Sequence, residues 1–227
     1  MKIRNLALGA LGAITLAVPV TTASAATYIS KLEYSSAGYQ SPAFGTVKIQ
    51  EINPNRVDVT VDFGSLVDLI VDTGNAHVAF SFNLSDTPNS TVSNLSPGFT
   101  YQPEGNYKNA PFGYFRNAIT CCGNGASNGI APPLKFSVNN NSGITFIGAG
   151  NRFISNTTGS AAGFTGGWWF AVDTYDAGRP GGANTFVVAA RDFAEVIAVP
   201  EPATWAMMII GFGAAGSLLR RQRAALA

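Results

Sequence analysis

The sequence predicts an all-β exported domain, a β-sandwich or jelly roll, between two apolar terminal segments. Two stretches, residues 57–63 and 78–84, alternate apolar and polar residues with the two-residue period of a strand. Clusters of Asn, Gly, Pro and Ser separate these stretches and further short apolar runs, as turns do in antiparallel proteins. No amphipathic helical stretch of any length lies between the terminal segments. These observations together favour short strands packed into one sandwich-like domain, residues 26–199.

The alternation also assigns faces to the two clearest strands. The expected inward positions are Val57, Val59, Val61 and Phe63 in the first, and Val78, Phe80, Phe82 and Leu84 in the second. Further strands are expected at 46–51, 66–71, 134–138, 144–147, 168–174 and 186–193. Residues 85–130 carry little strand signal and are rich in Asn, Gly, Pro and Ser, so we expect loops there, at one end of the sandwich.

Composition excludes several functions. Of 227 residues, 46% are hydrophobic and 12% charged, with a net charge of +1, which excludes a charged disordered chain and a basic nucleic-acid binder. One histidine and two adjacent cysteines argue against an ordinary zinc site, and no cofactor is expected. Residues 26–199 hold nine Lys or Arg and twelve Asp or Glu, a charge of −3 that favours solubility outside the cell.

The N-terminus has the organisation of a signal peptide, residues 1–25. Lys2 and Arg4 precede an uncharged apolar stretch from residue 6 to residue 20. Ala23 and Ala25 then supply the small side chains that signal peptidase requires. We expect cleavage after Ala25, so that the mature chain begins at Ala26.

Residues 203–219 are expected to form a single transmembrane helix near the C-terminus. These 17 uncharged residues would reach about 25 Å as a helix, the lower limit for a bilayer core. Trp205 stands near the outer end, where an indole suits the headgroup boundary. The cations Arg220, Arg221 and Arg223 follow the stretch and predict a cytoplasmic C-terminus.

Directly before this stretch, Pro200 and Pro202 flank Glu201 and hold it in an extended backbone. Pro-Glu-Pro, then Trp205 followed by Ala, then an apolar span and a terminal arginine cluster resemble the PEP-CTERM sorting signal of Gram-negative bacteria, in its PEPxxWA variety. The resemblance covers residues 200–223. It implies that an exosortase, an inner-membrane cysteine protease, processes the chain near Pro-Glu-Pro, so that the catalytic residues of that reaction belong to the exosortase.

The resemblance also implies a destination. Proteins with this signal are generally held transiently in the inner membrane and exported to the outer surface or extracellular matrix, often in bacteria that make exopolysaccharide. We therefore expect a non-enzymatic envelope or matrix protein whose partners are signal peptidase, exosortase and exopolysaccharide, and no nucleic acid.

Cys121 and Cys122 are adjacent and would reach an oxidising compartment after export. A vicinal disulfide, pairing between molecules and unpaired thiols all remain open, with the vicinal disulfide favoured. A structural role is expected in each case, because no histidine is near in sequence to activate a thiolate.

Two alternative functions need other residues. A secreted hydrolase would use His77 or two facing carboxylates, but His77 stands at a strand entrance outside any nucleophile-elbow motif. A carbohydrate-binding module would use Trp168 or Trp169 together with Tyr175, since an outward aromatic ring can stack on a sugar. Consecutive strand residues point to opposite faces, so one of the two tryptophans is expected to face outward. Calcium binding by loop aspartates stays open.

Overall fold

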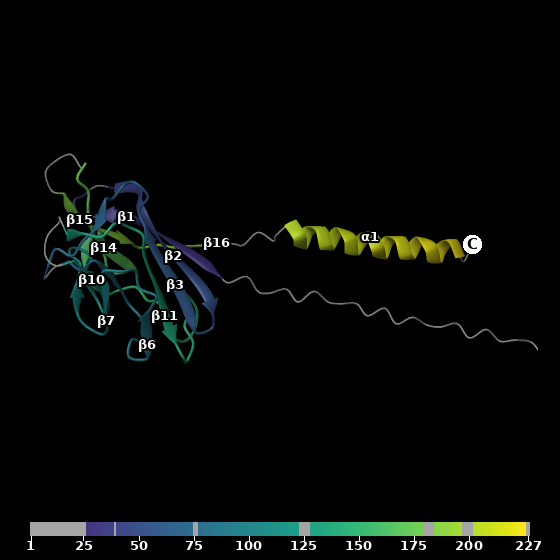
Figure 1. The fold of residues 1–227 in the computed structure, drawn as a ribbon, viewed down its shortest axis with the longest axis horizontal. Helices are drawn as coiled ribbons and strands as arrows, with labels where there is room; N and C mark the ends of the chain where they lie inside the picture. The colour runs from purple at the N-terminus through teal and green to yellow at the C-terminus, as the bar shows by residue number, and fades with distance from the viewer. Residues whose placement is uncertain are drawn as a thin grey trace, which may run out of the picture.

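Antiparallel strands account for nearly all of the regular structure between residues 26 and 196 (Figure 1), so the all-β prediction is confirmed. The computed structural model describes residues 26–38, 40–74, 77–122, 128–178, 184–196 and 202–225. The predicted signal peptide, including Ala23 and Ala25, lies outside the described residues. The elements are β1 (Thr27–Ser35), β2 (Gln40–Asn53), β3 (Arg56–Asp62), β4 (Leu69–Ile70), β5 (Phe80–Phe82), β6 (Ser90–Ser93), β7 (Phe99–Gln102), β8 (Tyr107–Lys108), β9 (Tyr114–Phe115), β10 (Asn117–Cys121), β11 (Leu134–Asn140), β12 (Ser160–Ala161), β13 (Phe164–Thr165), β14 (Phe170–Tyr175), β15 (Thr185–Ala190), β16 (Ala194–Val196) and α1 (Pro202–Ala225).

Twelve of the strands form one sheet that curls into a nearly closed barrel. Its order is β6-β11-β3-β2-β1-β15-β14-β5-β10-β7, with β16 beside β1 and β4 beside β14. The two edge strands, β6 and β7, are joined by only the five residues 94–98, so the ends of the sheet must lie near each other. The backbone N–H of Ser96, in this connection, donates to the Lys135 carbonyl of β11.

The main core fills the space enclosed by this sheet. In β3, Val57, Val59 and Val61 are buried as the alternation predicted, and Phe63 follows them inward. Phe82 of β5 reaches across the interior to Phe136 of β11, with ring centroids 5.6 Å apart. The core is therefore shared by strands that are not neighbours in the sheet.

A second, smaller apolar cluster covers the outer face of β14 and β15. Phe170 and Val172 of β14 point into the main core, whereas Ala171 points outward and is covered by Phe112 and Trp168. This half of the sheet is buried on both faces. Strand β5 consequently has Ser81 buried between Phe80 and Phe82, where alternation alone predicted a solvent-facing position.

Three sequence expectations need correction. Residues 85–130, expected as loops, contain β6 to β10, and β10 pairs with both β5 and β7. The expected strand 144–147 contributes only an isolated bridge between Thr145 and Arg152. Strand β1 was not predicted: the polar Ser30 stands at a buried position between Tyr28 and Leu32, whereas Lys31 and Glu33 lie on the other face. Pairing with neighbours on both sides places β1 and β10 in the large sheet whatever their own strand propensity.

Candidate functional site

His77 lies in a polar cluster on the outer face of β14. Its Nδ1 is 3.1 Å from the Thr73 hydroxyl oxygen, and that hydroxyl is 2.5 Å from Oδ2 of Asp173. The Thr73 backbone N–H donates to the same Oδ2 at 2.9 Å. Asp173 shares its strand face with Ala171, and its backbone pairs it with the segment that begins at Val71. The sheet therefore brings together residues that lie a hundred positions apart.

Burial dominates the electrostatics of this cluster. Asp173 is fully buried, and desolvation raises its pKa to about 7 against the opposing hydrogen bonds from Thr73. Its second oxygen, Oδ1, has no hydrogen-bond partner among the described residues. Burial likewise raises the pKa of Asp72 and lowers the pKa of His77. In the sequence, Asp173 is a lone carboxylate within an apolar strand. The alternation of apolar and polar residues does not indicate that such a carboxylate is buried.

The order of groups in this cluster differs from that of a hydrolytic triad. In a triad the imidazole lies between the hydroxyl and the carboxylate, which leaves the hydroxyl free to attack. Here the Thr73 hydroxyl lies between Asp173 and His77, where both neighbours hold it.

Nearby, buried Asn109 accepts from the backbone N–H of Val78 at 2.9 Å and donates to Ser81 at 2.8 Å. These bonds fasten the segments around residues 73 and 78 to the sheet. No group of three or more metal-ligating side chains gathers within the described ranges.

The two cysteines are joined by a vicinal disulfide at the end of β10. Cys122 has a φ of 49°, in the left-handed region, so the chain turns there as it leaves the strand. Residues 123–127, which follow, lie outside the described residues. The disulfide closes a turn between neighbouring residues and cross-links no distant segments.

The predicted sugar-contacting aromatics do not form one surface. Trp168 is fully buried, with its ring centroid 4.8 Å from that of Phe112, and is therefore unavailable to a sugar ring. Trp169 points to the opposite face as expected, but it is half-buried against Phe146 and Phe193. Tyr175, at the far end of β14, is six residues from Trp169, about 20 Å along a strand. Packing thus removes Trp168 from solvent, whereas Trp169 and Tyr175 keep part of their surface exposed and remain predicted contacts.

The predicted sorting residues Pro202, Trp205, Arg220, Arg221 and Arg223 all lie on α1, whereas Pro200 and Glu201 lie outside the described residues. Helix α1 begins at the second proline of Pro-Glu-Pro, a residue type well suited to a first helical turn. In Figure 1 the helix stands apart from the strands. The sorting residues are thus carried on an element separate from the barrel.

The apolar side chains of α1 are exposed on every side of the helix. Met207, Ile209, Ile210 and Phe212 have exposed fractions of 62%, 70%, 63% and 73%. Successive helical residues are 100° apart, so these positions cover the whole circumference and form no single stripe. By length and hydropathy, no helix within the described part of the chain qualifies as a membrane span.

Comparison with known families assigns this C-terminal region. The model of the PEP-CTERM protein-sorting motif matches residues 198–224. The chain carries a PEP-CTERM sorting signal. Such a signal marks an exported protein that an exosortase processes, which accounts for the Pro-Glu-Pro, the apolar helix and Arg220 with its neighbouring arginines. No curated protein and no solved structure matches the chain. The PEP-CTERM match begins at residue 198, directly after the last barrel strand, so the barrel itself lies outside the match.

Proposed function

We propose that this PEP-CTERM protein is a non-enzymatic component of the cell envelope or extracellular matrix. The sorting signal carries the proposal, because it directs the β domain outward and makes the chain a substrate of the exosortase. The charge of −3 over residues 26–199 suits a soluble domain outside the cell. Exopolysaccharide is the matrix partner that the signal implies.

Residues 203–219 of α1 hold the chain in the inner membrane until it is processed. Apolar side chains on all sides of a helix are stable only in an apolar environment, and Ile209 and Phe212 find none within the described protein. A lipid bilayer provides that environment, and the exposed Arg220 at the inner end favours a cytoplasmic C-terminus. Insertion therefore places Pro-Glu-Pro at the outer surface of the membrane, within reach of the exosortase.

The β domain acts by binding or by forming structure. Its single histidine and its buried Asp173 both contact the Thr73 hydroxyl. These contacts join two segments of the fold. The carboxylate of Asp58 on β3 is likewise engaged, by a two-point hydrogen bond from Arg56. These contacts support a structural role for each group.

The decisive experiment measures the intact mass and location of the protein in its host. The wild-type chain is expected to lose its signal peptide and everything after roughly residue 200, and to be found outside the cell. A variant with Pro200→Ala, Glu201→Ala and Pro202→Ala is expected to keep the full mature mass and stay in the inner membrane. A full-length wild-type chain in the inner membrane would show that the tail is only an anchor.

The chain provides a matched control for this variant. Pro103 and Glu104 form a second Pro-Glu pair, in the β domain, and Glu104 is exposed in a surface ion pair with Arg116. Replacing Pro103 and Glu104 by alanine is expected to leave mass and location unchanged. Loss of processing in this control would indicate an effect on the domain fold, unrelated to recognition of Pro-Glu-Pro.

A further inference from the structure

The two ends of the β domain lie side by side at one pole of the barrel. Strand β16 pairs antiparallel with the start of β1, with Thr27 opposite Val196 and Ile29 opposite Ala194. Thr27 stands next to the expected mature N-terminus, and Val196 is the last described residue before the PEP-CTERM signal. Figure 1 shows β16 leaving the barrel on the side of α1.

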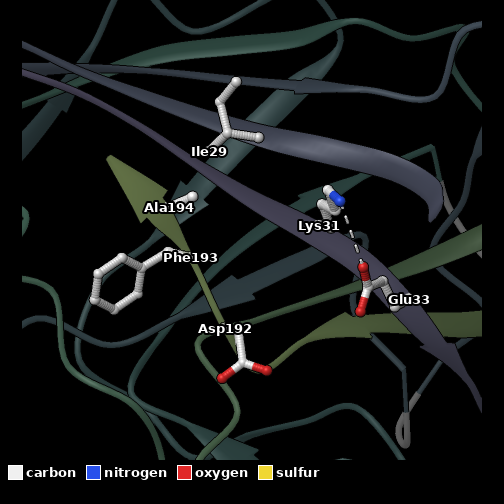
Figure 2. Close-up of a pocket in the computed structure, with 6 residues that line it drawn as sticks. All are labelled: Ile29, Lys31, Glu33, Asp192, Phe193 and Ala194. Atoms are coloured by element: carbon white, nitrogen blue, oxygen red, sulfur yellow. Dashed lines mark ion pairs between the residues drawn. The ribbon is translucent and has the colours of Figure 1, made fainter. Parts of the chain in front are cut away.

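The base of β16 is fixed to the barrel, so this exit point is well defined. Residues 191–193 separate β16 from β15, and the Ser30 hydroxyl of β1 donates to the Asp192 carbonyl at 2.6 Å. Phe193 packs edge-on against Trp169, with centroids 5.1 Å apart. A groove of about 190 Å³ opens beside this base. Figure 2 labels residues that line it, with Lys31 and Glu33 paired along β1.

The same pole is closed by an aromatic residue and carries exposed aliphatic side chains. Phe146 packs against Tyr28, with centroids 5.1 Å apart, and its backbone N–H donates to the Glu51 carboxylate at 2.8 Å. The residues that follow Phe146 and Glu51 are Ile147 and Ile52, which are 39% and 40% exposed. Val196 on β16 is 45% exposed. These three side chains, Ile52, Ile147 and Val196, define the tethered pole.

The connection between β16 and the expected span is short, so the tethered pole must stay close to the membrane. Val196 and the start of the expected span at residue 203 are seven residues apart, at most about 25 Å when fully extended. This step rests on the proposed insertion of α1. Lys48 and Glu195 are both exposed beside β1, so the described charges at this pole are of both signs and form no cationic cluster that would select anionic lipid.

We propose that the tethered pole is a membrane-contact surface, which touches the neutral, zwitterionic lipid of the outer leaflet while α1 remains inserted. Three partly exposed aliphatic side chains form too small a surface to hold the domain by themselves. The short connection supplies a high effective concentration of lipid at this pole. Cleavage near Pro-Glu-Pro removes the connection, so the contact is lost and the domain leaves the membrane.

Photo-crosslinking of the membrane-held full chain, in a host that lacks the exosortase, tests this proposal. A benzophenone amino acid replaces Ile147 in one protein and Leu66 in another. Leu66 is 54% exposed and follows the opposite end of β3, a strand about 20 Å long. Irradiation is expected to give lipid adducts, read by mass, at position 147 and none at position 66.

A third probe, at Phe212 of α1, separates this inference from the proposed function. Lipid adducts at 212 without adducts at 147 would overturn the membrane contact and leave the anchor intact. The absence of lipid adducts at 212 would overturn the anchor itself. In a host that keeps an inactive exosortase, an adduct of position 147 with that protease in place of lipid would assign the pole to a protein partner and overturn the proposal as stated.

Discussion

The β domain and helix α1 contain the same apolar residue types, but the domain buries these side chains and the helix exposes them. Phe80 and Val172 of the sheet are fully buried, whereas Ile209 and Phe212 of the helix are 70% and 73% exposed. In the sheet, the two-residue period collects apolar side chains on one face, and the curled sheet provides its own partner for that face. In α1 the apolar positions surround the helix, and no single protein surface could cover them. The described domain therefore covers its own apolar side chains, whereas those of α1 have no protein partner within the described residues.

The largest expected effect of a substitution falls on the domain side of this comparison. Phe80 packs with Phe82, Phe136 and Phe170 at centroid distances of 5.7 to 5.8 Å. Phe80→Ala is expected to lower the free energy of unfolding by about 3–5 kcal/mol, because it removes buried contacts and leaves a cavity. Chemical denaturation of the processed protein measures this loss. Leu66→Ala, at an exposed site, is the control and should change stability by less than about 0.5 kcal/mol.

The second prediction concerns the buried carboxyl of Asp173. Its pKa is raised to about 7, so the folded state binds a proton that the unfolded state has released between about pH 4 and pH 7. Stability should therefore fall as the pH rises through this range, by on the order of 4 kcal/mol at about 1.4 kcal/mol per unit. Asp173→Asn is expected to remove most of this fall, leaving the part due to the raised pKa of Asp72, and to stabilise the protein at pH 8. Thermal unfolding between pH 4 and pH 8 measures it.

His77 provides an internal check on that result. Because burial lowers the pKa of His77, its contribution has the opposite sign and makes the fold more stable as the pH rises toward 6.5. The Asp173→Asn protein should keep this smaller rise, and His77→Gln should remove it. A variant of Asp173 with the same falling profile as the wild type would contradict the assignment of the buried proton.

The sequence predicted a helix within the sorting signal and the inner face of β3, because each depends on local order. A run of apolar residues beside arginines identifies a sorting signal without any tertiary contact. The alternation at Val57, Val59 and Val61 likewise indicates the buried face of β3 by itself. The outer cluster was not predictable, because Trp168 and Phe112 meet on β14 only after the chain has folded over the sheet. Trp168, one of the predicted sugar contacts, belongs to that cluster and is thereby removed from solvent.

The third prediction concerns a substitution in helix α1 that leaves the β domain unchanged. Ile209→Arg places a charge at the middle of the expected span, which changes the apparent free energy of insertion by about 3 kcal/mol. The chain should then fail to stay in the inner membrane and should escape processing, while denaturation of the β domain is unchanged. Ile209→Leu is the matched control and should behave as wild type. Cell fractionation with intact mass measures both; normal processing of the arginine variant would mean that insertion is not required.

The smallest expected effect belongs to a half-exposed ion pair, and it has the opposite pH dependence to Asp173. Burial raises the pKa of Asp58, but hydrogen bonds from Arg56 and Ser137 lower it further, so the net pKa lies below its ordinary value. The carboxylate therefore stabilises the fold above about pH 4, and this contribution is lost as the pH falls through the folded pKa. Solvent screens a side chain that is 35% exposed, so Asp58→Asn should cost no more than about 1 kcal/mol at pH 7. Denaturant midpoints at pH 2.5 and pH 7 measure this cost, which should vanish at the lower pH. An equal cost at both values would mean that the geometry of the side chain, and not its charge, stabilises β3 against β11.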